Sequence, residues 1–306
     1  MALRVTQTMM NTQLLHNISN NLGRLNNLQN QMSTGRRINK PSDDPVGLTF
    51  SMRYRSEITS NAQYIKNADS AASLLDYTDM TIGQAGDIMQ RIRELAVKGG
   101  NGGQSQEGYD AINLEVKQLY DQMIDIGNSK FNGKYVFNGQ QTEVVPYSKL
   151  SIDDSGSPKA YDNVTDGGEI HFEISPGVTL ASNIFGNDAF GVAGADNNVF
   201  KVISDISAAL QDGNYQKVSD LIGTIDESIN NLLEKRAEIG ARMNRITLLQ
   251  DRLEGIGINL TGILSKTEDA NLSEVITNLK MDENVYQASL SAGARLISPS
   301  LVDFLR

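Results

Sequence analysis

The chain has 306 residues, no Cys and no Trp, and a formal net charge of -10. Without Cys it can form neither a disulfide framework nor a thiolate metal site. The acidic balance argues against a broad nucleic-acid-binding role, because phosphate contacts require clustered Lys and Arg.

The sequence also carries no membrane or secretory signal. No apolar run reaches the length of about 18 residues that spans a bilayer. Residues 1–30 are interspersed with Asn, Gln and Thr, and so lack the apolar core of a signal peptide. If the protein leaves the cell, it must use another route.

Charge is distributed unevenly between the two ends. Residues 1–41 contain five basic residues and no acidic one, whereas residues 267–306 contain six acidic and three basic residues. These are either two solvated helix faces of opposite sign, or ends that attract each other or complementary neighbours in an assembly.

Both ends show the apolar spacing of coiled-coil helices. Near the start, apolar residues alternate in steps of three and four at Leu15, Ile18, Leu22, Leu25 and Met32. Near the end, the same spacing runs through Leu253, Ile256, Leu260, Ile263, Thr267 and Ala270, and a looser row continues through Leu279, Tyr286, Leu290 and Ile297. These stripes are narrower than those of most globular helices. We therefore expect coiled coils, or helices whose apolar residues become fully buried only against a partner. The alternative is that they are ordinary bundle helices.

A long helix is predicted to begin near residue 45. Asp44 can cap its N-terminus, and Pro45 can occupy its first turn. Apolar spacing then continues to the glycine-rich segment 99–103. A helix from Pro45 to Lys98 would be about 80 Å long at about 1.5 Å per residue, so this part should be a rod. A return helix through Ile112 and Ile126 is expected to run antiparallel to it.

The middle of the chain changes to strand and turn signals. The Asn132–Gly133 pair, within the aromatic and β-branched segment 131–137, indicates a hairpin. Residues 140–197 are rich in Gly, Asp, Asn and Ser, and the segments 169–174 and 178–184 have the pattern of strands. Helical spacing returns at 198–210 and at 215–255.

Together these elements predict a mainly α, elongated fold with a small β-rich insertion. Residues 1–40 and 260–306 would form a terminal coiled-coil assembly domain. Residues 41–139 and 198–259 would form a helical rod that includes the hairpin, and residues 140–197 an inserted β-rich outer domain.

No pattern in the sequence indicates an enzyme. The two histidines, His16 and His171, lie in different predicted domains, and neither belongs to a His-Glu-x-x-His zinc motif. No Ser lies in a Gly-x-Ser-x-Gly elbow, and the glycines at 99–103 and 255–257 lack the spacing of phosphate or dinucleotide loops. The acidic pairs at 43–44 and 153–154 are interpreted as a capping turn and a solvated loop. We therefore expect no catalytic residue, no cofactor and no metal.

The segment Gln31–Pro45 closely resembles the N-terminal signature of the flagellin family. It reads Gln-Met-Ser-Thr-Gly-Arg-Arg-Ile-Asn-Lys-Pro-Ser-Asp-Asp-Pro, and the signature is a Ser/Thr-Gly-Arg/Lys-Arg-Ile-Asn segment followed by an acidic pair. The resemblance covers both helical ends, well over half of the chain, and leaves out residues 140–197. Three features resemble the subunits that join hook to filament more than filament flagellin: the start Leu3–Gln7, the prolines around the acidic pair, and the segment Asn132–Gly139. The segment 299–305 also differs from the usual flagellin ending.

The resemblance implies a structural role at the junction between hook and filament of the bacterial flagellum. Family members leave the cell through the flagellar type III export apparatus, and their terminal segments fold as coiled coils on assembly. The implied partners are the first hook-associated protein, flagellin, copies of the chain in a ring, and a cytoplasmic export chaperone, without nucleic acid or membrane insertion. The alternatives are filament flagellin and, from another class, a surface adhesin that binds ligand through the β-rich insertion.

Two sets of residues follow as hypotheses. In the assembled flagellum, apolar residues near the start are expected to pack against apolar residues near the end: Leu15, Ile18, Leu22 and Leu25 against Leu260, Ile263, Leu290 and Ile297. The amphipathic C-terminal segment is expected to bind the export chaperone through Leu279, Tyr286, Leu290, Leu301 and Phe304.

Overall fold

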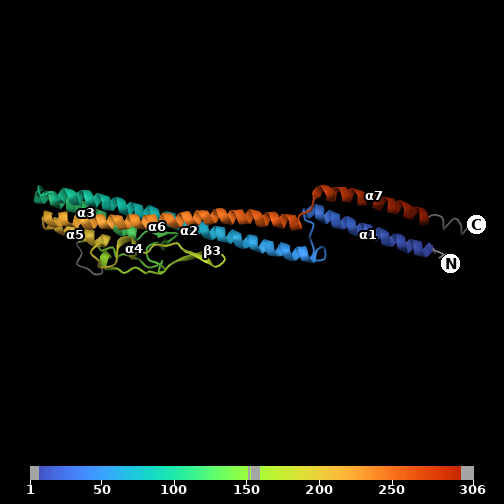
Figure 1. Cartoon of the computed structure of the whole chain (residues 1–306), viewed down its shortest axis with the longest axis horizontal. Helices are drawn as coiled ribbons and strands as arrows, with labels where there is room; N and C mark the ends of the chain where they lie inside the picture. The colour runs from blue at the N-terminus through green and yellow to red at the C-terminus, as the bar shows by residue number, and fades with distance from the viewer. Residues whose placement is uncertain (1–6, 151, 153–158, 298–306) are drawn as a thin grey trace, which may run out of the picture. The chain divides into compact units, whose positions relative to one another are not determined.

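The computed structural model describes residues 7–150, 152 and 159–297 (Figure 1), with only the backbone described at residues 7 and 295–297. The helices are α1 (Gln7–Thr34), α2 (Pro45–Gly100), α3 (Gln106–Gly127), α4 (Gly186–Phe190), α5 (Val199–Gln211), α6 (Tyr215–Glu268) and α7 (Leu272–Ile297). A 3-10 turn, η1, covers Ala160–Asp162, and the strands are β1 (Lys130–Phe131), β2 (Lys134–Tyr135), β3 (His171–Ser175) and β4 (Val178–Ala181). The predicted mainly α class, with long helices and little strand, is confirmed. Among the described helices, none is both long and apolar enough to cross a bilayer.

The chain divides into two compact units, each of which is described separately. The terminal unit joins both ends of the chain, residues 1–60 and 256–306, and the central unit consists of residues 61–255. Both long helices, α2 and α6, contribute to each unit.

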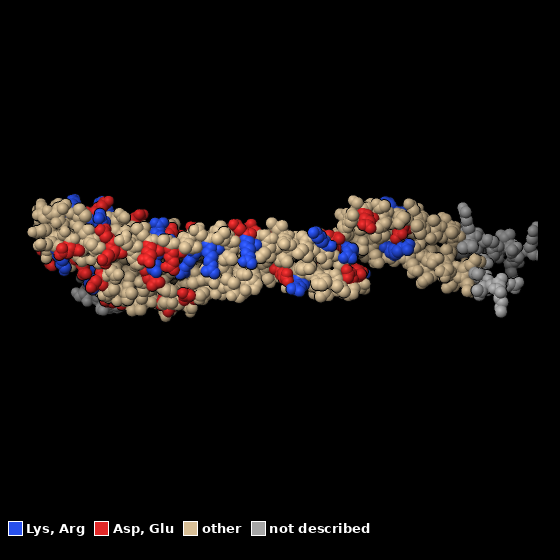
Figure 2. All heavy atoms as spheres, in the orientation of Figure 1, with Lys and Arg blue, Asp and Glu red and all other residues tan. Residues whose placement is uncertain are grey.

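In the central unit, α2 and α6 run antiparallel along each other. Four side-chain contacts link them: Asn61 Nδ2 to the Leu253 carbonyl at 2.9 Å, Gln250 Nε2 to Asp69 Oδ1 at 2.7 Å, Arg236 Nε to Asp79 Oδ1 at 3.0 Å, and Arg93 Nε to Asp226 Oδ1 at 2.6 Å. Figure 2 shows basic and acidic side chains interspersed on this unit. Exposed ion pairs stabilise a protein by only about 0–1 kcal/mol each, so most of the packing energy comes from the apolar core.

That core is continuous through α2, α3, α5 and α6. It includes side chains with no exposed surface from each helix: Leu75, Ile82, Met89 and Ile92 from α2, Val116 and Met123 from α3, Ile203 and Ile206 from α5, and Ile225 and Ile239 from α6. Apolar residues of segment 136–190, such as Phe137, Tyr147, Ile174 and Phe190, belong to the same core. The insertion therefore packs directly on the helices.

The predicted helix ends are close to the observed ones. Asn198 caps α5, its Oδ1 accepting hydrogen bonds from the amides of Phe200 at 3.1 Å and Lys201 at 3.3 Å. The helix predicted to stop at Lys98 ends at Gly100, at the beginning of the glycine-rich segment. The return helix begins at Gln106, earlier than its first predicted apolar residue.

The hairpin predicted at Asn132–Gly133 is present, and the two segments predicted as strands pair with each other in a second hairpin. Asn132 and Gly133 have φ values of 49° and 80°, the two positive values that a type I′ turn between β1 and β2 requires. β3 and β4 also pair antiparallel, with an irregularity between Glu173 and Ser175, and are shorter than the segments 169–174 and 178–184 would suggest. Asn side chains bond to backbone groups in much of the remaining insertion. Asn163 donates to the Pro146 carbonyl and Asn183 to the Gly168 carbonyl, while Asn183 accepts from the Ile170 amide and Asn138 from the Asp166 amide.

The expected end of a helix at Gly255 is wrong, because α6 continues to Glu268. Glycine within a helix costs about 0.5–1 kcal/mol relative to Ala, and Leu260 and Leu264, both partly buried, favour its continuation. The apolar row predicted to run through Ala270 is also interrupted, because the helix breaks at residues 269–271 and α7 begins at Leu272.

Candidate assembly site at the terminal helix pair

The loop between α1 and α2, which contains the sequence signature, is shaped by its own polar groups. Gly35 ends α1 with φ at +69°, and its amide donates to the Gln31 carbonyl at 2.8 Å. The Asp43 carboxylate accepts from the amides of Lys40 at 2.8 Å and Asn39 at 3.0 Å. These two bonds, that from Lys40 most of all, stabilise the ionised carboxylate and lower the pKa of Asp43.

Asp44, the second acidic residue of the signature, caps α2 as predicted. Its Oδ1 accepts from the amide of Gly47 at 2.8 Å. A Cβ atom at Gly47 would clash with Asp44 Oδ2 and would lie 2.7 Å from the Cδ1 atom of Ile38, which is buried. A side chain at position 47 would therefore displace the Asp44 cap or Ile38, and both acidic residues of the signature serve the turn.

Three arginines converge on the end of α6, at Glu268, in what we call the arginine clamp (Arg36, Arg37, Arg55 and Glu268). The Glu268 side chain is only 5% exposed, and its carboxylate lies 2.8 Å from Arg36 Nε and 3.1 Å from Arg55 Nε, with a further bond from Arg55 Nη2. Arg37 donates through its amide to the Glu268 carbonyl at 2.7 Å and through Nη2 to the Thr267 carbonyl at 2.9 Å. An unpaired buried carboxylate is strongly destabilising, so Glu268 requires these arginines.

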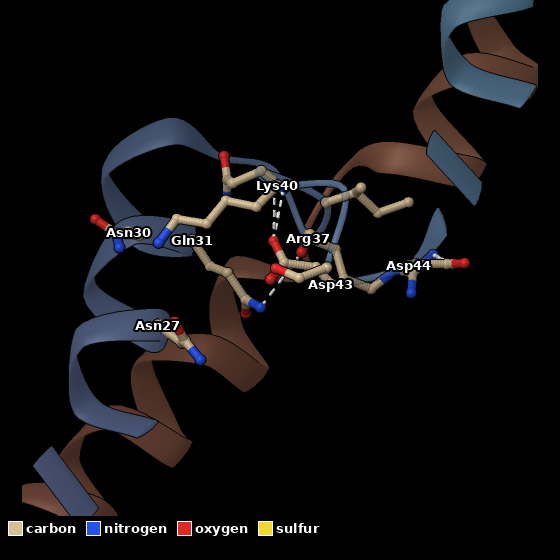
Figure 3. Close-up of a pocket in the computed structure, with 10 residues that line it drawn as sticks. Asn27, Asn30, Gln31, Arg37, Lys40, Asp43 and Asp44 are labelled. Carbon is tan, nitrogen blue, oxygen red and sulfur yellow. Dashed lines mark hydrogen bonds and ion pairs between the residues drawn. The ribbon is translucent and has the colours of Figure 1, made fainter. Parts of the chain in front are cut away.

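A cavity of about 370 Å³ lies beside this loop (Figure 3), lined by Asn27, Asn30, Gln31, Arg37, Ile38, Asn39, Lys40, Ser42, Asp43 and Asp44. Asn27, Asn30 and Gln31 come from α1, and Gln31 Nε2 donates to the Arg37 carbonyl at 3.4 Å. In the described ranges, no group of three or more His, Asp or Glu side chains is placed to hold a metal ion. The cavity lies between α1 and the loop, and most of its lining residues are polar.

Helices α1 and α7 pair antiparallel in the same unit. The Ala270 amide donates to the Gly35 carbonyl at 2.9 Å where the pair begins, and a Cβ at Gly293 would lie 2.9 Å from Leu14 near its other end. The buried and partly buried residues along this pair follow a heptad row on each helix. They are Leu14, Ile18, Asn21, Leu25 and Leu28 on α1, and Val275, Leu279, Asp282, Tyr286, Ser289 and Gly293 on α7.

The predicted assembly residues are divided between this row and the outer surface. Ile18, Leu25 and Leu260 are partly buried, whereas four leave their side chains exposed: Leu15 by 66%, Leu22 by 45%, Ile263 by 37% and Leu290 by 45%. The side chain of Ile297 lies outside the described residues. Within the chain, α7 therefore covers Leu14 and Asn21, which each precede by one residue the predicted Leu15 and Leu22.

The residues expected to bind a chaperone are also divided. Leu279 is buried and Tyr286 partly buried in the row of α7, while Leu290 is exposed. Leu301 and Phe304 lie outside the described residues. The two histidines take no part in the clamp: His16 is exposed on α1, and His171 Nε2 lies 3.1 Å from Glu169 in the central unit.

The outer surface of α1 is suited to burial against another protein. Arg24 is the only Lys, Arg, Asp or Glu in the helix, whose remaining polar residues are mostly Asn, Gln, Ser and Thr. Removing neutral side chains from water costs much less than removing charges. The exposed leucines can therefore be covered without removing an array of charges from water.

The clamp and the break before α7 were not predicted from the sequence. A local signal for the break exists, since Asn271 followed by Glu274 has the spacing of a helix N-terminal capping box. For the clamp no local signal exists, because its residues are far apart in the sequence.

Two family models match the chain on either side of the insertion. The model of the bacterial flagellin N-terminal helical region matches residues 5–142, and that of the C-terminal helical region matches residues 222–305. The matched ranges include the signature loop, the clamp and the paired helices.

Similar proteins span nearly the full chain. Flagellar hook-associated protein 3 of Salmonella typhimurium is 26% identical, over 94% of this chain and 95% of its own. Flagellin of Bacillus subtilis is 28% identical, over 89% of this chain and 88% of its own.

Among solved structures, a putative flagellar hook-associated protein of Vibrio parahaemolyticus aligns with a TM-score of 0.66 at 21% identity, covering 74% of this chain and 100% of that one. The flagellar junction protein FlgL of Legionella pneumophila aligns with a TM-score of 0.57 at 14% identity, covering 73% and 100%. These likenesses concern the fold. Because the two flagellin models together match well over half of the residues and include the signature loop with the helices that it joins, the chain belongs to the flagellin family.

Proposed function

We propose that this flagellar structural protein forms the junction between the hook and the filament, and that its terminal helices carry the contacts to neighbouring subunits. The observation that carries the assembly role is the terminal helix pair, which uses one row of residues internally and leaves a second apolar row exposed. The alignment to a hook-associated protein 3 along almost its whole length supports the position at the junction.

Assembly would bury the exposed row. Leu15, Leu22 and Leu290 on the paired helices, and Ile263 on α6, would pack against apolar residues of adjacent subunits. Full burial of a Leu or Ile side chain contributes about 1.5–3 kcal/mol, and the contacts repeat around a ring. The partners are further copies of the chain, the first hook-associated protein on one side and flagellin on the other.

In this proposal the chain has three functional segments. Residues 1–40 and 260–306 form the assembly segment, residues 41–139 and 198–259 the helical support, and residues 140–197 the outer insertion. The signature loop connects the first two, because the Glu268 carboxylate binds both Arg36 and Arg55 through charge-assisted bonds.

Export precedes assembly in this proposal. The chain passes through the flagellar type III apparatus, and a cytoplasmic chaperone holds α7 through its apolar residues before export. Because Leu279 is buried where α7 pairs with α1, chaperone binding and pairing of these helices exclude each other. The role is structural and involves no catalytic residue or cofactor.

The test is to locate the protein on flagella of the source bacterium. An antibody raised against residues 140–197 is used for immunogold labelling of intact flagella, with a strain lacking the gene as the control. A single band of gold at the boundary between hook and filament is the expected result. Gold along the filament would instead support flagellin, which the similarity to the Bacillus subtilis protein makes the second candidate. Absence of gold from the flagellum would contradict both.

A further inference from the structure

Three polar residues, Asn21, Asp282 and Ser289, interrupt the rows along which α1 and α7 meet, and Arg24 lies beside them. Arg24 donates from Nε to Asp282 Oδ2 at 3.3 Å, and from Nη2 to Asp282 Oδ1 at 3.4 Å and to Asn21 Oδ1 at 2.8 Å. Asn21 in turn donates from Nδ2 to Ser289 Oγ at 3.4 Å. We call this connected network the polar layer.

Three members of the polar layer, Asn21, Asp282 and Ser289, occupy positions where a helix pair ordinarily has leucine. Asn21 is 8% exposed and Asp282 9% exposed, and both lie in the heptad rows, whereas the Arg24 side chain remains 59% exposed. Replacing a buried polar network by apolar side chains of similar volume is often neutral or stabilising. Stability therefore does not explain why these residues are present in the row.

Only one register of the two helices satisfies the polar layer. Arg24 is the only Lys, Arg, Asp or Glu in α1, so the Asp282 carboxylate has one cation within reach along that helix. A slip of one heptad would break the Ala270–Gly35 bond at the start of the pair. Along the helices it would keep the apolar rows in contact, yet would move Asp282 away from Arg24 and into an apolar or amide environment. A buried carboxylate without its partner is strongly destabilising, and the slipped register is thereby excluded.

We propose that the polar layer of Asn21, Arg24, Asp282 and Ser289 fixes the register in which α1 and α7 pair, and so determines which apolar residues the pair presents to neighbouring subunits. A single polar residue at a core position is known to specify register in coiled coils at a cost in stability. The significance for assembly rests on the function proposed above, but the register itself is a property of the chain.

The absence of Cys from the chain allows a direct measurement of register. Leu14→Cys with Gly293→Cys places two thiols where the helices touch in the observed register. Leu14→Cys with Tyr286→Cys would bring them together only after a slip of one heptad. Each pair is introduced into the full-length chain, and disulfide formation is measured at equilibrium in a glutathione redox buffer at a protein concentration too low for cross-linking between chains.

We expect the observed-register pair to be favoured at least about tenfold over the slipped pair when the polar layer is intact, as a single buried polar residue can specify register. In the background Asn21→Leu with Asp282→Leu, the ratio should be clearly lower than in the intact chain, with the helix content measured by circular dichroism unchanged or higher. Asp282→Asn is the matched control, because its amide oxygen can still accept from Arg24 and should preserve most of the preference.

Two outcomes would overturn the proposal: equal disulfide formation by both pairs in the intact background, or an undiminished preference in the background with leucines. Neither outcome would affect the junction role, which the position of the gold label decides independently. A label along the filament, in turn, would leave the measured register unchanged.

Discussion

Glu268 illustrates how a single carboxylate can join distant parts of the chain. Its side chain is 5% exposed, while the arginines that it binds, Arg36 and Arg55, are 48% and 46% exposed. The guanidinium groups therefore keep part of their hydration, whereas the carboxylate loses nearly all of its contact with water. Loss of the arginines should consequently be more damaging than loss of an ordinary surface ion pair.

We predict that Arg36→Ala with Arg55→Ala destabilises the terminal unit by about 3–5 kcal/mol, the cost of leaving a buried carboxylate unpaired. The measurement is hydrogen exchange at the amide of Arg37, which is hydrogen-bonded within the clamp, and at that of Ala270, which is hydrogen-bonded beside it. Arg53→Ala is the matched control, because the Arg53–Glu57 pair is exposed and should contribute less than about 1 kcal/mol. Equal exchange in the two variants would contradict the role of the clamp.

The signature loop should respond to acid through Asp43. Hydrogen bonds from the amides of Lys40 and Asn39 lower the pKa of this carboxyl below its ordinary value, which is about 3.9. A lowered pKa in the folded state means that the carboxylate contributes stability above about pH 3.9, and that this contribution is lost as the pH falls through the folded-state pKa. NMR titration of the Asp43 carboxyl should give a pKa below the ordinary value. Asp43→Asn should remove the corresponding acid step in amide exchange of the loop, and an ordinary or raised pKa would refute the assignment.

At the scale of the element, α1 presents two apolar rows that differ by one residue in register. Leu14 belongs to the row that meets α7, and Leu15 and Leu22 to the exposed row. A helix with two such rows can pair within its own chain and with a neighbour at the same time. The near absence of charge on α1 makes the second pairing less costly.

We predict that Leu22→Asp with Leu290→Asp prevents incorporation into the flagellum without unfolding the chain, because both side chains are 45% exposed here and a charge would have to be buried on assembly. Incorporation is measured by immunoblot of sheared flagella, and folding by circular dichroism. Leu114→Asp with Leu233→Asp is the matched control, since these leucines of the central unit are 63% and 53% exposed. Normal incorporation of the first variant would exclude the exposed row as an interface.

At the scale of the whole molecule, the chain places its two ends in one unit and its middle in another. Pairing between α1 and α7 thus closes the chain on itself, with the clamp next to the point where the helices begin to pair. The same pairing buries Leu279, one of the residues proposed to bind the export chaperone. The state of the helix pair should therefore control access of the chaperone.

We predict that a disulfide between Leu14→Cys and Gly293→Cys abolishes chaperone binding, because α7 is then held against α1. Binding of the purified chaperone to the full-length chain is measured by calorimetry before and after reduction, so that the reduced protein serves as its own control. Equal affinity in both redox states would show that the chaperone does not require an unpaired α7. Deletion of Leu279–Arg306, which also removes position 293 and so the disulfide, should abolish binding.

Much of the local structure could be predicted from short segments. Asp44 and Pro45 mark the start of α2, Asn132–Gly133 the first hairpin, and Asn198 the start of α5, since in each case the residue itself supplies the required bond or φ angle. The helix predicted over 215–255 is too short, because α6 continues past Gly255 and Gly257 to Glu268. The cost of glycine in a helix is small enough for favourable side-chain contacts to outweigh it.

The sequence by itself determined the mainly α class, the order of helices and hairpins, and, through the segment Gln31–Pro45, the resemblance to flagellins. The tertiary structure alone decided which of two overlapping rows on α1 meets α7, and that Arg36, Arg55 and Glu268 form one clamp. Helical periodicity is compatible with either row, because neighbouring residues lie only about 100° apart around a helix with 3.6 residues per turn. The choice is made by the partner helix, whose contacts and polar layer lie more than two hundred residues away in the chain.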